Sequence, residues 1–340
     1  MKKILFLAMA AAALVSCSQN EEFENAGQKA EIKFGTLVSS TTRAAITNLD
    51  KLKEVGFTVY AYNTGAKSMA GVSAISDINS FIPEKKVTYA TESDSWNIEG
   101  GDTYYWPLTD NIQFFAYANG TATYNAPAAP SFYPTIDFTV VADNQNQTDF
   151  VVAQATDKTK DNASSGITLA FTHALTQVNF SVKGADENTY KITSITLKSV
   201  ANQGRYDFKS ETWTNVTGTA DYTYNLIDNP TVQGTTPKEI GAANSALMLM
   251  PQAMPDAEGT SSIEVVYQVF NGADQPLTNA ITSKIDLKGT TTAWQVGKKI
   301  RYVLELSNQG AKMKFVPEVG DWTTEQSPEQ EENAKPTPAV

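Results

Sequence analysis

The chain has 340 residues, of which 37 are acidic and 26 are basic, so its formal net charge is −11. A negative chain without clustered lysines is unsuited to nucleic acid, whose phosphates require a basic face. The same charge disfavours attraction to an anionic membrane surface. At about 150 residues per domain, this length predicts two domains, each large enough for its own hydrophobic core.

The first seventeen residues have the layout of a secretion signal. Lys2 and Lys3 precede an apolar run at residues 4–15, which is too short to be a stable membrane anchor. No later stretch is apolar over the ~18 residues that a membrane-spanning helix requires. We therefore expect residues 1–16 to be a signal peptide.

Cys17 is the only cysteine in the sequence. It directly follows the residues Leu14, Val15 and Ser16, where a bacterial lipoprotein carries its acylated cysteine. A lone thiol forms no internal disulfide, so a lipid anchor explains Cys17 better than the alternative, a chance cysteine near an ordinary cleavage site. The polar, acidic residues 18–22 resemble the signal that sorts lipoproteins of the Bacteroidales to the outside of the outer membrane. Acyl chains such as palmitate would then be the membrane anchor.

Two elements are predicted before the main β-rich region. Residues 30–38 have the pattern of a first strand, with Ile32, Phe34 and Thr36 on one face. A short helix is predicted after Thr47, which we expect to cap its N-terminus, and Gly56 ends it.

The rest of the chain has the two-residue periodicity of strands that bury one face. Val178, Phe180 and Val182, for example, alternate with polar residues. Strands are predicted at residues 57–62, 112–118, 136–140, 150–153, 167–171, 177–183, 192–200, 246–250, 263–269 and 300–306. Turn-forming clusters separate them at residues 63–65, 99–102, 202–204 and 271–272. The fold class is therefore all-β, with two β-sandwich domains in tandem.

A polar stretch and a break in the alternation mark the domain boundary. Residues 156–166 are polar, and residues 173–175 interrupt the long β run that follows. We expect a lipidated prosegment with the first strand at 17–43, an N-terminal sandwich at 44–172, a C-terminal sandwich at 173–322 and an acidic tail at 323–340. The tail contains almost nothing that could be buried, so it should be disordered.

Catalytic chemistry is hard to assemble from these residues. His173 is the only histidine, and it lies on an apolar strand without a nearby nucleophile-elbow glycine pattern. We interpret it as a packed or hydrogen-bonded structural residue. No dinucleotide, phosphate-loop or calcium-loop motif is present, and the usual zinc ligand sets cannot be completed. We expect no enzyme activity, metal or cofactor, although carboxylate pairs that meet only in the fold remain open.

Two further groups have a binding interpretation and a packing interpretation. The aromatic residues 104–106 before Pro107 could stack on sugar rings or could close one end of a sandwich core. Met248, Met250 and Met254 could form an adaptable contact surface or could fill gaps in the core. Packing is favoured in both cases.

Several segments, in their order along the chain, resemble the Mfa-like fimbrillin family of the Bacteroidales. They are Thr42-Arg43-Ala44, residues 56–62, residues 105–108 followed by 114–117, residues 171–175 and residues 319–322. The resemblance covers about residues 30–322. It implies two transthyretin-like (Greek-key) sandwich domains, no catalysis, and location at the cell outer membrane and in a fimbria (pilus).

The resemblance also implies assembly after an arginine-directed protease cuts between Arg43 and Ala44. The cut would free the first strand. Our candidate to replace it is the C-terminal segment of another subunit, with Met313, Phe315 and Trp322 as apolar anchors. The expected partners are other pilus subunits of the same or another kind, the lipid anchor, and a host or bacterial surface receptor. One alternative is a permanently anchored lipoprotein that binds glycan or a host protein without polymerising; Arg43 would then be an ordinary linker residue. The other alternative, a hydrolase, has little support in the sequence.

Overall fold

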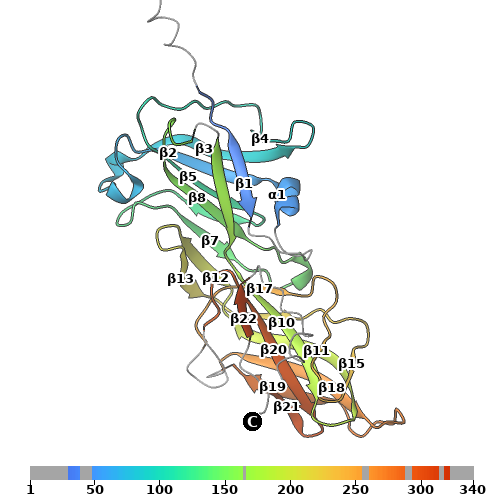
Figure 1. Cartoon of the computed structure of the whole chain (residues 1–340). Coiled ribbons are helices and arrows are strands. Elements are labelled where there is room, and N and C mark those ends of the chain that lie inside the picture. Colours follow the sequence, from blue (N-terminus) through green and yellow to red (C-terminus); the bar gives the residue numbers. More distant parts are fainter. Residues whose placement is uncertain are drawn as a thin grey trace, which may run out of the picture.

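The computed structural model describes residues 30–38, 48–163, 166–254, 260–287, 293–313 and 318–321. Within them the chain is almost entirely β-structure, which confirms the predicted all-β fold. Figure 1 shows an elongated molecule in which two β-rich regions lie end to end, with a smaller sheet between them. We call these parts the barrel, the C-terminal sandwich and the joining sheet.

The barrel is a closed sheet of seven strands in the order β1-β4-β3-β2-β5-β8-β9. Their bounds are β1 Phe34–Val38, β2 Phe57–Asn63, β3 Asn79–Ala90, β4 Ser95–Ile98, β5 Ile112–Ala118, β8 Val151–Lys158 and β9 Ile167–His173. The sheet closes because β1 pairs in parallel with β9. Aromatic side chains fill the interior, with Phe57, Phe114 and Phe171 almost completely buried. Closure leaves the barrel without an open edge.

The described residues contain one α-helix, α1 (Leu49–Val55), which packs against the barrel through the buried Leu52. Its N-cap is Asn48, whose side chain accepts a hydrogen bond from the Lys51 backbone N–H at 2.8 Å. The predicted helix is thus confirmed, but its side-chain cap is Asn48 and not the predicted Thr47, which lies outside the described part of the chain. Gly56 ends the helix with a positive φ of 68°, as expected of a C-terminal glycine.

The C-terminal sandwich consists of two sheets around a shared core. One contains β10 Thr176–Gly184, β16 Lys238–Glu239, β17 Leu247–Leu249, β20 Lys298–Ser307, β21 Gly310–Met313 and β22 Glu318–Asp321. The other contains β11 Thr189–Val200, β14 Ala220–Thr223, β15 Thr231–Gln233, β18 Ser262–Phe270 and β19 Ile281–Asp286. Phe180 and Tyr302 from the first sheet and Tyr190 and Tyr267 from the second are all buried in this core.

The joining sheet has four strands in the order β13-β12-β7-β6: β6 Ala122–Asn125, β7 Thr135–Thr139, β12 Gln203–Asp207 and β13 Thr212–Thr217. Strands β6 and β7 come from the part of the chain proposed as the N-terminal domain, 44–172, and β12 and β13 from the part proposed as the C-terminal domain, 173–322. The chain passes between the two at the end of β9, with β10 starting at Thr176. The proposed halves therefore share a sheet.

The predicted strands agree with observed ones, but several elements were not predicted. They include β3, β4, β6, β12 to β16, β19, β21 and β22, and the short 3-10 helices Met69–Gly71, Ile75–Asp77 and Asn144–Asn146. The predicted turn at residues 202–204 is wrong in part, because Gln203 and Gly204 begin β12 and pair with β7. Glycine is needed here to avoid a steric clash with a neighbouring strand, because a Cβ on Gly204 would lie 2.9 Å from the Trp213 ring.

The aromatic and methionine groups lie mainly in the core, as the packing interpretation predicted. Trp106 is buried, with its ring centroid 6.1 Å from that of Phe114, while Tyr105 is 43% exposed. Met248 and Met250 are buried, and Met254 packs against the same core from a partly buried position.

Candidate functional site

The first candidate site is the position of β1 in the barrel. β1 pairs in parallel with β9 from Phe34 opposite Ile167 to Val38 opposite Phe171, and it pairs with β4 at Phe34 opposite Trp96. Its neighbours therefore come from distant parts of the sequence. A strand placed between two others leaves two rows of backbone groups without partners if it departs.

The side chains of this first segment divide as the sequence predicted. Ile32 and Phe34 are buried, whereas Leu37 is 61% exposed. The Phe34 ring lies edge-on to Phe57 and Phe114, with centroids at 6.0 and 6.1 Å. Phe34 is thus the main apolar anchor of β1 in the barrel core.

The contact continues beyond the start of β1. Ile32 donates its backbone N–H to the carbonyl of Tyr104 at 2.8 Å, and Trp106 donates to the carbonyl of Ala30 at 2.9 Å. Residues 30–38 therefore use three partners: β9, β4 and the segment around residues 104–106. The aromatic group that we considered for sugar stacking instead holds the chain ahead of β1.

The residues proposed for anchoring and processing lie outside the described part of the chain. These are Cys17, Arg43 and Ala44. In the described part, β1 ends at Val38 and α1 begins at Leu49, so the proposed cleavage point lies between two ordered elements. No described helix is long and apolar enough to cross a membrane.

The proposed donor segment is partly described. Met313 ends β21 opposite Leu304 of β20, and β22 pairs with the start of β20, with Val319 opposite Ile300. Together, β21 and β22 follow one side of β20, while β10 pairs with the other. Phe315 and Trp322 lie outside the described residues.

His173 is a buried structural residue, as predicted. Its Nδ1 lies 2.8 Å from Oδ2 of Asp149, and the two side chains are 1% and 0% exposed. The pair connects the end of β9 to the residues just before β8. A histidine enclosed in this way does not face a substrate. Among the described residues, no group of three or more histidine, cysteine or acidic side chains is placed to hold a metal ion.

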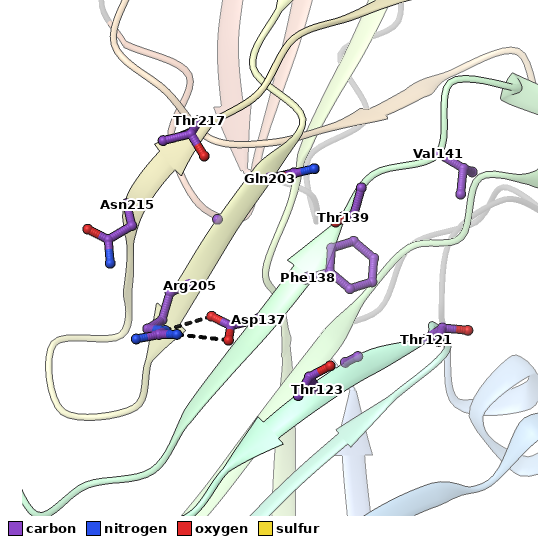
Figure 2. A pocket seen from close by; sticks show the side chains of 12 residues that line it. Thr121, Thr123, Asp137, Phe138, Thr139, Val141, Gln203, Arg205, Asn215 and Thr217 are labelled. Atoms are coloured by element: carbon purple, nitrogen blue, oxygen red, sulfur yellow. Dashed lines mark hydrogen bonds and ion pairs between the residues drawn. The ribbon is translucent and has the colours of Figure 1, made fainter. Parts of the chain in front are cut away.

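The second candidate site is a groove of about 510 Å³ on the outer face of the joining sheet, which we call the joining groove. Figure 2 shows side chains from all four strands around it. Its lining residues are Thr121, Ala122, Thr123, Asp137, Phe138, Thr139, Val141, Gln203, Gly204, Arg205, Asn215 and Thr217. A smaller cavity of about 290 Å³ shares Thr121, Phe138, Thr139 and Val141 with it, so the hollow extends past the end of β7.

An ion pair joins the two middle strands of the sheet within the joining groove. Arg205 donates from Nε and Nη2 to the two carboxylate oxygens of Asp137, at 2.6 and 2.9 Å, as the dashed lines in Figure 2 show. Asn125 also donates to Asp137, at 3.0 Å. The hydrogen bonds from Arg205 hold the pKa of the Asp137 carboxyl below its usual value, and the same contact raises the pKa of Arg205. Both groups are therefore charged at neutral pH.

Sequence reasoning missed the joining groove. The alternation at residues 136–140 placed Asp137 and Thr139 on an outer strand face correctly. Their partners lie on β12, which the sequence presented as a turn. Arg205 and Asp137 are 68 residues apart in the sequence. No local pattern in a single sequence indicates that two residues at this separation are in contact.

Comparisons with known proteins agree with this architecture. A family model described as "Fimbrillin-like" matches residues 42–322. Among solved structures, a fimbrial protein from Bacteroides vulgatus has a TM-score of 0.66 at 20% identity, covering 86% of this chain and 99% of that one. A candidate cell adhesion protein from Bacteroides uniformis has a TM-score of 0.48 at 16% identity, covering 87% and 99%. No curated protein matches. Since the family model spans most of the sequence, the chain belongs to the fimbrillin-like family.

Proposed function

We propose that this protein is a structural and adhesive subunit of a surface pilus. In this proposal it is exported as an outer-membrane lipoprotein and assembles by strand exchange after proteolysis at Arg43. Family membership and the fimbrial character of the structurally similar Bacteroides vulgatus protein support the pilus role. The position of β1, ahead of Arg43 and inside the closed barrel, carries the mechanism.

Cleavage after Arg43 would separate β1 from the covalent chain without removing any later element. Its departure would expose the β9 backbone from Ile167 to Phe171 and the apolar space that Ile32 and Phe34 fill. An open strand position beside an apolar groove is a template for a strand from another chain. The contact would join each subunit to the next in a head-to-tail arrangement that does not close, which produces a filament.

The replacing strand must offer apolar side chains two residues apart, to match Ile32 and Phe34. Met313 and Phe315 have this spacing. In the isolated chain, however, β21 and β22 pair with β20. Donation by the C-terminal segment therefore requires that it leaves its own sheet, and the new contacts must offset the hydrogen bonds that are lost.

The decisive experiment changes Arg43 and follows assembly at the cell surface. Arg43→Ala should leave uncleaved lipoprotein monomers in the outer membrane, and truncation before Met313 should give cleaved subunits that do not polymerise. Arg43→Lys is the matched control for charge, since a protease that reads arginine should reject it as well. The readouts are electron microscopy of fibres and N-terminal sequencing, which should find Ala44 first in the wild type.

The anchored alternative makes the opposite prediction. If fibres persist in both the Arg43→Ala and the truncated chains, strand exchange at these ends is wrong and the subunits assemble by another route. If the wild-type protein keeps its uncleaved N-terminal segment and no fibre contains it, the non-polymerising surface lipoprotein becomes the better interpretation. The lipid anchor is tested independently by Cys17→Ala, which should release the protein from outer membranes or block its maturation. Retention of that variant in outer membranes after a high-salt wash would contradict the anchor.

A further inference from the structure

We propose that the joining groove binds a neutral oligosaccharide. This proposal rests on the adhesive part of the proposed function and names a site and a ligand class for it. It does not depend on strand exchange, because every lining residue belongs to the joining sheet or to the loops beside it.

The outer face of the joining sheet presents two rows of polar side chains across its strands. In the first row, Asp137 lies between Thr123 on β6 and Arg205 on β12. In the second, Gln203 lies between Thr139 on β7 and Thr217 on β13. The rows result from strand pairing, since every second residue of a strand points to the same face. They form a regular array of hydroxyl, amide and carboxylate groups.

A β-bulge completes the array at its β13 side. Between the Gln203–Thr217 and Arg205–Thr214 pairs, β13 has one more residue than β12. Asn215 lies in this bulge with a left-handed φ of 51°, and its side chain lines the groove. Bulges commonly redirect a side chain at functional positions. Asn215 thereby adds an amide donor and acceptor beside Arg205.

The charges in the groove favour a neutral ligand. Among the described residues that line it, Arg205 and Asp137 are the only charged ones, and they form a bidentate pair. An anionic ligand would have to compete with Asp137 for the guanidinium, and a cationic ligand would have to compete with Arg205. The remaining polar groups are threonine hydroxyls and the amides of Gln203 and Asn215. These groups donate and accept hydrogen bonds without a net charge, which suits the hydroxyls of a sugar.

Size and shape favour an oligosaccharide over other neutral ligands. The volume of about 510 Å³ lies within the range of roughly 300–1,000 Å³ typical of ligand sites. The adjoining cavity lengthens the hollow toward Asn146 and Gln147, which gives an extended chain of sugar rings more room. Val141, which is 46% exposed, supplies an apolar contact for the C–H face of a sugar ring. A peptide strand would instead need the edge of a sheet, and an apolar ligand would leave the polar rows unpaired.

The test uses the full chain as a monomer and a panel of defined sugars. The neutral probes are maltotriose, mannotriose and N-acetyllactosamine, and the charged probes are 3′-sialyllactose and a heparin tetrasaccharide. Binding is measured by saturation-transfer NMR and by titration calorimetry at probe concentrations up to about 10 mM, because an open groove with a few hydrogen bonds corresponds to weak affinity. We expect binding of at least one neutral probe and none of the charged ones.

Three variants test the location. Thr139→Trp should fill the groove and abolish binding. Asn215→Gly should weaken it about tenfold, since one lost hydrogen bond corresponds to roughly 1.4 kcal/mol, while glycine keeps the left-handed backbone. Thr135→Ala is the control, because Thr135 lies on the same strand and strand face but does not line the groove. Asp137→Asn leaves Arg205 without its carboxylate and should admit 3′-sialyllactose.

The outcomes separate this proposal from the pilus mechanism. Failure of all neutral probes to bind, or equal binding by wild type, Thr139→Trp and Asn215→Gly, would overturn the glycan site. Fibre formation measured on the same variants should remain at the wild-type level. If fibres disappear in the Arg43 variants while neutral sugars still bind, the two functions are confirmed as separate. If binding is lost with fibres intact, only the glycan site is implicated.

Discussion

The two ends of the described chain contribute strands in different ways. At the N-terminal end, β1 lies between β4 and β9 and closes the barrel. At the C-terminal end, β21 and β22 cover one side of β20, whose other side already pairs with β10. Loss of β1 would open a ring and expose a buried aromatic core. Loss of β22 would uncover a stretch of one strand in a sheet that remains packed.

This difference bears on which end can serve as a receiver and which as a donor. A receiver must present a deep apolar groove after its own strand leaves. In the barrel this would be the space that Phe34 of β1 fills beside Phe57 and Phe114. A donor must leave its parent domain without unfolding it, and an outer strand pair such as β21 and β22 meets this requirement better than an interior strand. The asymmetry is consistent with head-to-tail assembly.

The largest effect should come from Phe34→Ala. Removing a buried aromatic side chain costs about 3 kcal/mol or more of unfolding free energy, through lost burial and the cavity that remains. Urea unfolding of the full chain, followed by fluorescence, measures it. The matched control is Leu37→Ala on the same strand, where a 61% exposed side chain should cost less than about 0.5 kcal/mol. Similar losses in both variants would show that β1 is not anchored through its buried face.

An intermediate effect is expected when β22 is removed. A chain that stops before Glu318 should lose about 1–3 kcal/mol, because a few strand hydrogen bonds contribute roughly 0.5–1.5 kcal/mol each. The control stops after Asp321 and keeps β22. Should the shorter chain be less stable than Phe34→Ala, the comparison between an interior strand and an outer strand would fail, and β22 could not leave β20 at low cost.

The smallest effect concerns the joining sheet, through which the two regions are connected. The pKa of Asp137 is lowered in the folded state, chiefly by Arg205. Its contribution to stability is therefore complete above the ordinary carboxyl pKa of about 3.9 and is lost as the pH falls through the lower folded value. The pair is partly exposed, at 44% and 40%, so we expect less than about 1 kcal/mol.

Comparison of wild type with Asp137→Asn isolates this contribution from other carboxyl groups. The difference in unfolding free energy between the two proteins should be largest near pH 7 and should shrink below about pH 4. The pKa of Asp221 is also lowered, chiefly by its hydrogen bond from Lys198. Because Asp221 is present in both proteins, its contribution cancels in the difference between their unfolding free energies. A difference that is constant with pH would mean that the Asp137–Arg205 pair is not formed in solution.

The strand pattern was predictable because it depends on local alternation. At residues 136–140 and 177–183, one buried face is enough to mark a strand. Strands such as β13, where every residue is exposed or partly exposed, lack that signal. The N-cap of α1 was likewise not decided by local sequence. Threonine and asparagine are both good caps, and it is the geometry of the helix that identifies Asn48 as the capping residue.

The all-β class, the buried face of the first strand, the burial of His173 and the core position of Met248 and Met250 could all be predicted from the sequence, because each follows from the hydrophobicity of neighbouring residues. The pairing partners of the strands could not be predicted and are known from the tertiary structure. The parallel pairing of β1 with β9, the position of β22 beside β20 and the Arg205–Asp137 contact all join residues far apart in the chain. Strand pairing at such distances depends on how the whole sheet closes. The periodicity within one segment shows which of its faces is buried but does not indicate which strand it pairs with.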